Sequence, residues 1–374
     1  MKLTTAGESH GKALLGIIEG LPANLEINIE EIDRYLALRQ SGYGRGGRQK
    51  IERDRVEILS GVRNRKTLGS PIAFSVANSD YSNWREFMAP EGCDVSPKQL
   101  TAVRPGHADL TGLKKFGQSD ARNVLERASA RSTAAQVVAG TVARQYLKAL
   151  GVEISGYVRS VCGVKDMGEY AFEQLEAAKD NPLFMLDKKA EAKAVKLVDK
   201  LKAEGDTAGG VIEIRVKGLK SGFGSCMQSD LKLDALLCSG IMGVQAIKGV
   251  EIGAGFGAAE LSGSKVHDEI FYNGDFYRTT NNAGGIEGGM SNGEEIVVRA
   301  AMKPIPTLMK GLKTVDYVTK EPLVAAAERS DTCAICAAEI VLESVTALVI
   351  AEAVATRLGG DYMDEVTKRY RDLK

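Results

Sequence analysis

Histidine, tryptophan and net charge are what this sequence has least of. It has three histidines and one tryptophan in 374 residues, and its 49 lysines and arginines equal its 49 aspartates and glutamates. A protein that coats nucleic acid needs a basic excess, so the zero net charge argues against a nucleic-acid partner. Because histidine is this scarce, each copy can be judged by its own surroundings.

Long uncharged runs and a secreted cysteine framework are also missing. The most apolar segment, residues 334–358, is interrupted by four charged residues, whereas a membrane span needs about 20 apolar residues. The apolar stretch at residues 13–18 is short and runs into Glu19, unlike a secretory leader. The six cysteines are spread along the chain, which is typical of a reduced compartment. We therefore expect a cytoplasmic protein with no membrane partner.

One cysteine pair has C-x-x-C spacing, Cys333 and Cys336. A single pair with no nearby histidine cannot complete a four-ligand zinc site, and we expect no metal site. The pair opens a segment rich in alanine, isoleucine and valine, where cysteine behaves as a small apolar residue. We interpret both cysteines as core residues, with a redox or metal role as the alternative.

Hydrophobic periodicity predicts a chain of mixed helices and strands. Strands are expected at residues 14–19, 56–62, 72–77, 211–218 and 295–303, and helices at residues 29–40, 120–150, 188–204 and 334–358. Asn28 is a plausible cap for the first helix. No linker rich in proline or serine divides the chain, so we expect a single domain over residues 1–374.

Two weak internal matches share one offset. Residues 16–21 (GIIEGL) resemble residues 214–219 (IRVKGL), and the Arg-Ser pair at residue 131 resembles the one at residue 329, both at an offset of 198. A common offset predicts two related halves, at about residues 1–150 and 200–350, and hence a pseudo-twofold architecture.

The segment at residues 39–66 contains nine basic residues but only three acidic ones. Part of this segment, residues 42–47 (GYGRGG), is too rich in glycine to be core. Arginines on such a backbone suit bidentate binding of phosphate or carboxylate. A solvated basic loop is the equal alternative for this segment taken alone.

Two of the three histidines lie in polar glycine turns. His10 stands in GESHG (residues 7–11) and His107 in RPGHAD (residues 104–109). Neither lies on an apolar periodic face, and imidazole titrates near neutral pH, so both are proton-transfer candidates. His267 has the surroundings of a surface residue and receives no role.

Three further segments carry charge in places that suit anion binding. Arg127 and Arg131 are four residues apart in the predicted helix 120–150, which predicts two stacked cations with an anion between them. Residues 303–307 (KPIPT) form a rigid loop after a strand, and Asp331 precedes the last long helix. The glycine-dense segments match neither a P-loop nor a Rossmann fingerprint, which argues against an NTPase or an ordinary nicotinamide dehydrogenase.

Taken together, these motifs resemble the chorismate synthase family. They run in order over essentially the whole chain: GESHG (7–11), RQSGYGRGGR (39–48), LSGV (59–62), RPGHAD (104–109), RASARST (127–133), KPIPT (303–307) and RSD (329–331). Two positions depart from the commoner family pattern. Gln245 stands where asparagine is frequent, and Cys336 stands where a proline often follows the RSD motif.

The resemblance implies a lyase that converts 5-enolpyruvylshikimate 3-phosphate to chorismate and phosphate in the shikimate pathway, with reduced FMN and no net redox change. It implies an α+β sandwich, with helices packed between antiparallel-rich sheets, and a homotetramer. NADPH bound by this chain or an external flavin reductase could each supply the reduced flavin. Two other functions stay open: an FMN-dependent reductase of a phosphorylated acid, and a non-catalytic anion-binding or scaffold protein.

The resemblance also implies site residues. His10 corresponds to the acid that protonates the departing phosphate, with Ser9 beside it in a relay. His107 corresponds to the donor of a proton to the reduced flavin, and Asp331 to the carboxylate that acts with flavin N5 in removing the C6 hydrogen. Substrate anions are assigned to Arg39, Arg45, Arg48, Arg104 and Arg131, of which Arg39 and Arg45 alternatively bind a nicotinamide phosphate. FMN contacts are assigned to Arg127, Ala128, Ser129, Gln245, Ala246, Gly288, Lys303, Pro304, Ile305, Pro306, Thr307 and Arg329.

Overall fold

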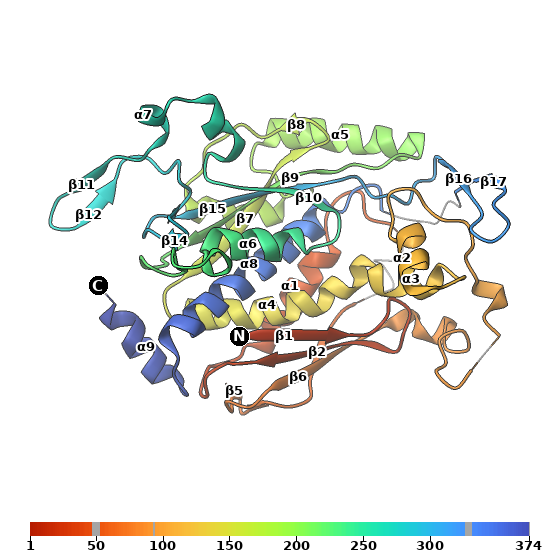
Figure 1. Ribbon diagram of the computed structural model, residues 1–374, viewed down its shortest axis with the longest axis horizontal. Helices are drawn as coiled ribbons and strands as arrows, with labels where there is room; N and C mark the ends of the chain where they lie inside the picture. Colours follow the sequence, from red (N-terminus) through yellow and green to blue (C-terminus); the bar gives the residue numbers. More distant parts are fainter. Residues whose placement is uncertain (47–52, 93, 326–330, 374) are drawn as a thin grey trace.

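Two antiparallel sheets enclose a layer of long helices (Figure 1). The computed structural model describes residues 1–46, 53–92, 94–325 and 331–373. The α+β sandwich with helices between antiparallel sheets, expected from the family resemblance, is confirmed.

The first sheet is built by the N-terminal part of the chain. Its strand order is β1 (Lys2–Ala6), β2 (Ala13–Glu19), β6 (Ile72–Ala77) and β3 (Val56–Ile58), and every neighbouring pair is antiparallel. Strand residues alternate between the two faces of a sheet. Leu14 and Ile18 are therefore buried against the helices, while Leu15 and Ile17 are exposed on the outer face.

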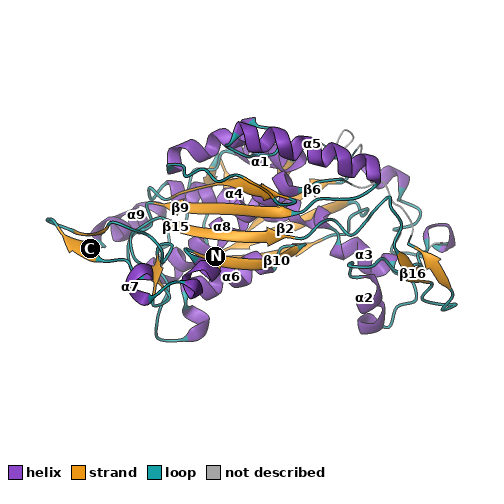
Figure 2. Ribbon diagram, turned by 90° about the horizontal axis from the view of Figure 1, so that it is seen from above, coloured by secondary structure: helices purple, strands orange, loops and turns teal. Residues whose placement is uncertain are grey.

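The second sheet is built by the C-terminal part. Its strand order is β10 (Ile247–Ile252), β15 (Ile296–Met302), β9 (Gly210–Lys217), β7 (Glu153–Val161) and β8 (Val164–Lys165), again antiparallel throughout. The strands of both sheets run along the long axis of the molecule (Figure 2).

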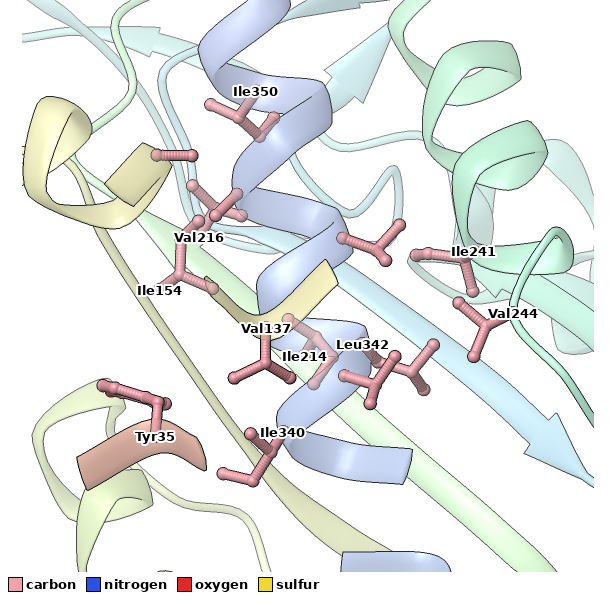
Figure 3. Packing of buried hydrophobic residues seen from close by; sticks show 14 of the residues in the cluster. Tyr35, Val137, Ile154, Ile214, Val216, Ile241, Val244, Ile340, Leu342 and Ile350 are labelled. Atoms are coloured by element: carbon pink, nitrogen blue, oxygen red, sulfur yellow. The ribbon is translucent and has the colours of Figure 1, made fainter. Parts of the chain in front are cut away.

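Four helices form the middle layer. They are α1 (Ile29–Gln40), α4 (Thr133–Lys148), α6 (Leu233–Met242) and α8 (Ile335–Leu358). Figure 3 shows Val137 of α4, Leu342 of α8 and Ile214 of β9 packed together in the core. Gly140 allows α4 and α8 to approach closely, because a Cβ there would lie 2.3 Å from the Cβ of Ser344.

The remaining elements surround this sandwich. The helices are α2 (Asp109–Phe116), α3 (Arg122–Ala128), α5 (Lys188–Glu204), α7 (Gly263–Val266) and α9 (Met363–Asp372), with 3-10 turns η2 (Ser79–Asn83), η3 (Ser96–Lys98), η4 (Ala130–Ser132), η5 (Phe172–Asp180), η6 (Ser229–Leu231) and η7 (Gly255–Glu260). The hairpins are β4 (Val62–Arg63) with β5 (Lys66–Thr67), β11 (Ile270–Tyr272) with β12 (Phe276–Arg278), β13 (Ile286–Glu287) with β14 (Met290–Ser291), and β16 (Lys313–Val315) with β17 (Pro322–Val324). Among the described residues, none of the helices combines the length and apolarity that crossing a membrane requires.

The main elements of the two sheets follow each other in the same sequence. The first set is β1, β2, α1, β3, β6 and α4, and the second is β7, β9, α6, β10, β15 and α8, with the same neighbours paired in each sheet. The second set begins with β7, before residue 200, because η5 and α5 are inserted between β7 and β9. The relation between two halves of the chain stays a prediction.

Most elements lie where the periodicity predicted them, and the cap at Asn28 is confirmed by its side chain, which accepts from the Glu31 amide. Two predictions were wrong. The expected strand 56–62 ends at Ile58, and Gly61 turns the chain with φ +80°. The expected helix 120–150 is broken after Ala128, because Ser129 has extended backbone torsions and its side chain accepts from the Arg131 amide.

Candidate active site

The turn between β1 and β2 is held by the end of α3. The backbone amide of Ser9 donates to the carbonyl of Glu126 at 2.9 Å. The next amide, that of His10, donates to the Glu126 carboxylate at 2.8 Å. Arg127 donates to the carbonyl oxygens of Gly7 and Thr5, each at 3.1 Å. The motifs at residues 7–11 and 127–133 therefore form one structural unit, although they are far apart in the sequence.

The His10 imidazole is fixed in both orientation and tautomer. Its Nδ1 lies 2.8 Å from Glu126 Oε1, and its ring packs on Trp84 with 4.1 Å between centroids and 31° between the ring planes. Burial raises the pKa of Glu126, but bonds from His10 and the charge of Arg122 outweigh burial and hold it below its usual range. An ionised carboxylate only accepts hydrogen bonds, so Nδ1 carries the hydrogen. Nε2 has no hydrogen-bond partner among the described residues and is the nitrogen left for chemistry.

Ser9 is buried beside this histidine. Its side-chain oxygen lies 3.2 Å from that of Ser129, which caps the turn η4 before α4. Two hydroxyls within hydrogen-bond distance of each other are suited to a proton relay.

His107 is held by a second buried carboxylate. Its Nδ1 lies 2.5 Å from Asp109 Oδ1, and Arg104 donates to both oxygens of the same carboxylate at 2.8 and 3.0 Å. Burial opposes ionisation of Asp109, but the bonds from His107 and Arg104 lower its pKa well below the usual range. Arg104 Nη2 also lies 3.2 Å from His107 Nδ1, but the shorter contact is with the carboxylate, which only accepts, so we assign the hydrogen to Nδ1. Nε2 of His107 has no hydrogen-bond partner within the described ranges.

Arginines that were predicted to bind anions pair with carboxylates of the protein itself. Arg39 and Arg131 both pair with Asp54, at 3.6 and 2.5 Å, and Arg39 also donates to the side chain of Thr133. Burial is the main cause that lowers the pKa of Arg39 to about 10, and repulsion by Arg131 adds to it. Arg45 pairs with Asp331 at 2.8 Å. Its buried Nε has no hydrogen-bond partner in the described part of the chain.

The predicted stack of Arg127 on Arg131 is wrong. Because α3 ends at Ala128, the two side chains leave the backbone in different directions. Arg127 binds the β1–β2 turn, whereas Arg131 donates to Asn78 and Ala77 as well as to Asp54. No anion is needed between them.

The other candidate cofactor residues connect to the His107 turn. Lys303 donates its backbone amide to the carbonyl of Ala246 at 2.9 Å and its side chain to the carbonyl of Gly106. Gln245 donates to the side chain of Ser132 at 3.0 Å, and Arg104 lies 3.5 Å from the Thr307 hydroxyl. The loops at 104–107, 245–246 and 303–307 are thus neighbours, with Pro304, Ile305 and Pro306 in the last of them.

Not every predicted site residue is brought into this group. Gly288 lies in the turn between β13 and β14, and its neighbour Gly289 accepts from the amide of Leu233 at the start of α6, whereas Gln245 follows the other end of that helix. Arg48 and Arg329 lie outside the described residues. His267 is exposed, as expected.

Sequence reasoning missed Glu126, Trp84 and Asp54. Glu126 stands next to a quoted motif, and Trp84 is the single tryptophan, but neither had a local pattern that indicated a role. Their importance comes from contacts with distant parts of the chain. Glu126 is 116 residues from His10 in the sequence, and Asp54 is 77 residues from Arg131.

Within the described ranges, no three His, Cys, Asp or Glu side chains gather in a way that could hold a metal ion. Cys333 and Cys336 are buried, and burial raises the pKa of both thiols. They pack against the glycines of the basic segment, where a Cβ at Gly42 would lie 2.6 Å from the Cβ of Cys336. The interpretation of this pair as core residues is confirmed by their burial.

The fold and site define a class of protein, an α+β enzyme with two carboxylate-held histidines beside buried arginines. The family model described as chorismate synthase matches residues 1–355. A curated chorismate synthase from Alkaliphilus metalliredigens (strain QYMF) is 53% identical over 374 residues, covering 99% of this chain and 98% of the relative. One from Thermus thermophilus is 51% identical over 378 residues, covering 100% and 99%. A solved structure entitled "Crystal Structure of Chorismate Synthase" superposes with a TM-score of 0.80 at 39% identity, covering 99% and 96% of the two chains. The chain belongs to the chorismate synthase family.

Proposed function

We propose that this chain catalyses the 1,4-anti elimination of phosphate from 5-enolpyruvylshikimate 3-phosphate to give chorismate, as a carbon–oxygen lyase of the shikimate pathway. The observation that carries the proposal is the pair of histidines whose Nδ1 atoms are held by Glu126 and Asp109, which leaves two Nε2 atoms for proton transfer. An elimination of this kind needs an acid for the leaving group, a base for the departing hydrogen and stabilisation of charge between them.

The substrate has one phosphate and two carboxylates, and the buried arginines match that charge. Arg39, Arg45, Arg104 and Arg131 each lie beside a carboxylate of the protein, which orients the guanidinium group before a ligand arrives. The unpartnered Nε of Arg45 is a further donor for a substrate anion. Arg48 belongs to the same proposal from its motif alone.

The proton steps are assigned to this chain's own residues. His10 gives a proton from Nε2 to the leaving phosphate, and the hydroxyls of Ser9 and Ser129, 3.2 Å apart, are the relay proposed beside it. Asp331 is oriented by Arg45 and by the amide of Gly46, and its carboxylate can serve as the base for the C6 hydrogen. His107 offers Nε2 for proton transfer next to the loop at 303–307, which Lys303 joins to the His107 turn.

The residues at 245–246 and 303–307 fit a flavin. The buried Oε1 of Gln245 has no hydrogen-bond partner within the described ranges, so it can accept from a ligand N–H. Ala246 has φ +69°, which turns its backbone out of the regular strand geometry just before β10. These loops, together with Arg127, Ala128 and Ser129, would hold FMN, and Gly288 and Arg329 belong to the same proposal from the family resemblance alone. Reduced FMN supplies electron density that helps the C–O bond break.

NADPH and an external flavin reductase are both candidate sources of the reducing equivalents. A cytoplasmic location and a homotetramer are also part of the proposal.

An anaerobic assay tests this function. We expect chorismate and phosphate to form in equal amounts from 5-enolpyruvylshikimate 3-phosphate when chemically reduced FMN is present, without stoichiometric oxidation of the flavin. Consumption of one reduced flavin per product would favour the FMN-dependent reductase instead. No product in the presence of reduced FMN would overturn the proposal.

Replacing the histidines separates an enzyme from an anion-binding scaffold. We expect His10→Ala and His107→Ala each to lower turnover by about 10²- to 10⁴-fold while binding of substrate and FMN persists, because each removes one proton-transfer group. The exposed His267→Ala is the matched control and should leave turnover unchanged. Unchanged turnover in the first two variants would favour a non-catalytic role.

A further inference from the structure

We propose that Glu126 is the positioning residue of His10, holding the hydrogen on Nδ1 so that Nε2 faces the reaction. The inference rests on the proposed function for its chemical consequence, since it assigns the residue that makes His10 competent as the acid.

The contacts to Glu126 are unusually complete. Its backbone carbonyl accepts from the amide of Ser9, its Oε2 accepts from the amide of His10, and its Oε1 accepts from His10 Nδ1, all between 2.8 and 2.9 Å. One residue of α3 therefore fixes both the backbone of the β1–β2 turn and the imidazole that the turn presents. Glu126 is itself buried, with an exposed fraction of 4%.

Only a carboxylate satisfies both side-chain contacts. The two donors, the His10 amide and Nδ1–H, approach different oxygens. Glutamine has one acceptor oxygen and one NH₂ group, so one of the two donors would face another donor. If the NH₂ group faces the ring, it donates to Nδ1 and moves the hydrogen to Nε2. The ring then cannot take up the second proton that an acid must carry, because Nδ1 is no longer free to hold a hydrogen.

Neighbouring side chains hold Glu126 and the ring from two more directions. Arg122 lies 3.3 Å from Glu126 Oε1, and its guanidinium also lies over the Trp84 ring at 4.7 Å. Lys98 lies over the same ring at 4.7 Å, and Trp84 stacks on His10. The imidazole is thus fixed at its edge by Glu126 and on one face by Trp84, whose own position depends on two cations.

The second histidine has the same arrangement, which supports the assignment. Asp109 accepts from His107 Nδ1 and is held by Arg104, as Glu126 accepts from His10 Nδ1 and is held by Arg122. The two carboxylates differ in their sequence distance from the histidine. Asp109 is two residues away, within one motif, whereas Glu126 is 116 residues away.

A pocket gives access to Glu126 for a chemical test. The cavity has a volume of about 150 Å³ and is lined by Glu126, Lys98, Arg122 and Phe87 among others. A water needs about 10–15 Å³ of such space, so formate fits beside the two cations. In Glu126→Ala, formate can occupy the position of the lost carboxylate.

The kinetic experiment compares Glu126→Gln, Glu126→Ala and Glu31→Gln in the full-length protein. Glu31 is the matched control, because it accepts one side-chain hydrogen bond from Gln145 in the first turn of α1. We expect both Glu126 variants to lose about 10²- to 10⁴-fold in kcat with little change in KM, as expected when a histidine adopts the wrong tautomer. Formate should restore part of the activity of Glu126→Ala but none of Glu126→Gln, and Glu31→Gln should keep its activity.

A spectroscopic readout tests the same inference without turnover. The chain has three histidines, so the ¹⁵N signals of histidine-labelled protein can be assigned by single replacements. At about pH 8, where free imidazole is mostly neutral, we expect His10 to carry its hydrogen on Nδ1 in the unmodified protein and to shift toward Nε2 in Glu126→Gln.

The outcomes separate this inference from the proposed function. If the unmodified protein makes no chorismate, the proposed function fails, and the tautomer of His10 still decides the role of Glu126. If both Glu126 variants keep their kcat, or lose it while the His10 tautomer stays the same and formate has no effect, Glu126 is not a positioning residue.

Discussion

Buried carboxylates decide how the charged residues of this protein are used. Asp54 pairs with two arginines, Asp109 with Arg104 and His107, and Glu126 with His10 and Arg122. Each carboxylate holds a cation or an imidazole in one orientation. Although the whole chain has zero net charge, its candidate site gathers several cations, each of which lies beside a carboxylate.

The pKa of Asp109 leads to a prediction about acid stability. Because its pKa in the folded state is below the usual range, Asp109 contributes stability above about pH 4, and this contribution is lost as the pH falls further. We expect Asp109→Asn to lower the free energy of unfolding by about 3 kcal/mol at pH 7, and the difference from the unmodified protein to shrink below about pH 4. Urea unfolding at several pH values measures this.

The exposed Asp230→Asn provides the comparison, with no expected loss at any of these pH values. If the difference in free energy of unfolding between Asp109→Asn and the unmodified protein stays constant across the acid range, the contacts of Asp109 do not keep its carboxyl group ionised.

The crossing of α4 and α8 is the element-level contact on which the sandwich depends. A Cβ at Gly140 would lie 2.5 Å from the backbone carbonyl oxygen of Ser344. The two helices could accommodate that Cβ only if the backbone of one of them shifted. We expect Gly140→Ala to lower the free energy of unfolding by about 1–3 kcal/mol despite the better helix propensity of alanine. Thermal or urea unfolding measures this.

Gly257 is a suitable control for that replacement, since a Cβ there would meet nothing within 4 Å. Equal stability of the Gly140→Ala and Gly257→Ala variants would mean that α4 and α8 can move apart freely.

The long helix α8 also carries a fully buried carboxyl group, that of Glu339. Lys179 lies 3.8 Å from one of its oxygens, and the carboxyl group of Glu343 is within hydrogen-bond reach of it. Burial, followed by repulsion from Glu343, raises the pKa of Glu339 well above its usual value. The folded protein therefore holds a proton that the unfolded chain releases above about pH 4.3.

From this we expect the unmodified protein to lose stability as the pH rises above about 4.3, up to the folded-state pKa of Glu339. Glu339→Gln should remove that loss. The free energy of unfolding of the variant, relative to that of the unmodified protein, should therefore grow by at most about 1.4 kcal/mol for each pH unit. Urea unfolding between pH 5 and about pH 8 compares it with the exposed Glu204→Gln. An advantage that does not grow with pH would contradict the protonated state of Glu339.

Both parts of the chain contribute to one core and one site. A single cluster of buried residues includes Leu14 of the first sheet, Ile214 of the second and the helices between them. The candidate site likewise joins the two parts, because Lys303 donates to the carbonyl of Gly106 and Asp331 pairs with Arg45. Neither part can keep its apolar surface buried without the other.

Unfolding of the whole molecule should therefore be one event. The single tryptophan, Trp84, lies beside His10 in the site, whereas helix content comes mainly from the middle layer. We expect the urea transitions followed by Trp84 fluorescence and by far-ultraviolet circular dichroism to coincide. Two separated transitions would contradict the prediction of a single domain.

Local sequence patterns predicted the helices and strands better than the points at which they are interrupted. The helix at residues 29–40 and its cap at Asn28 depend on neighbouring residues, and both are confirmed. The break at Ser129 was missed because alanine and serine on either side are compatible with a continuous helix. The extended conformation there depends on contacts of Arg127 and Arg131 with distant parts of the chain.

The sequence alone indicated candidate residues for the chemistry, because motifs such as GESHG and RPGHAD combine titratable side chains with glycines whose conformational freedom is a local property. The His107–Asp109 pair was also within reach, since its members lie two residues apart. Only the tertiary structure decided how the reactive groups are held: Glu126 on His10, Asp54 on Arg39 and Arg131, and Asp331 on Arg45. The physical reason is that most of these contacts join segments far apart in the chain, and Arg45–Asp331 joins its two parts, so they form only when folding brings these segments together and buries their charges.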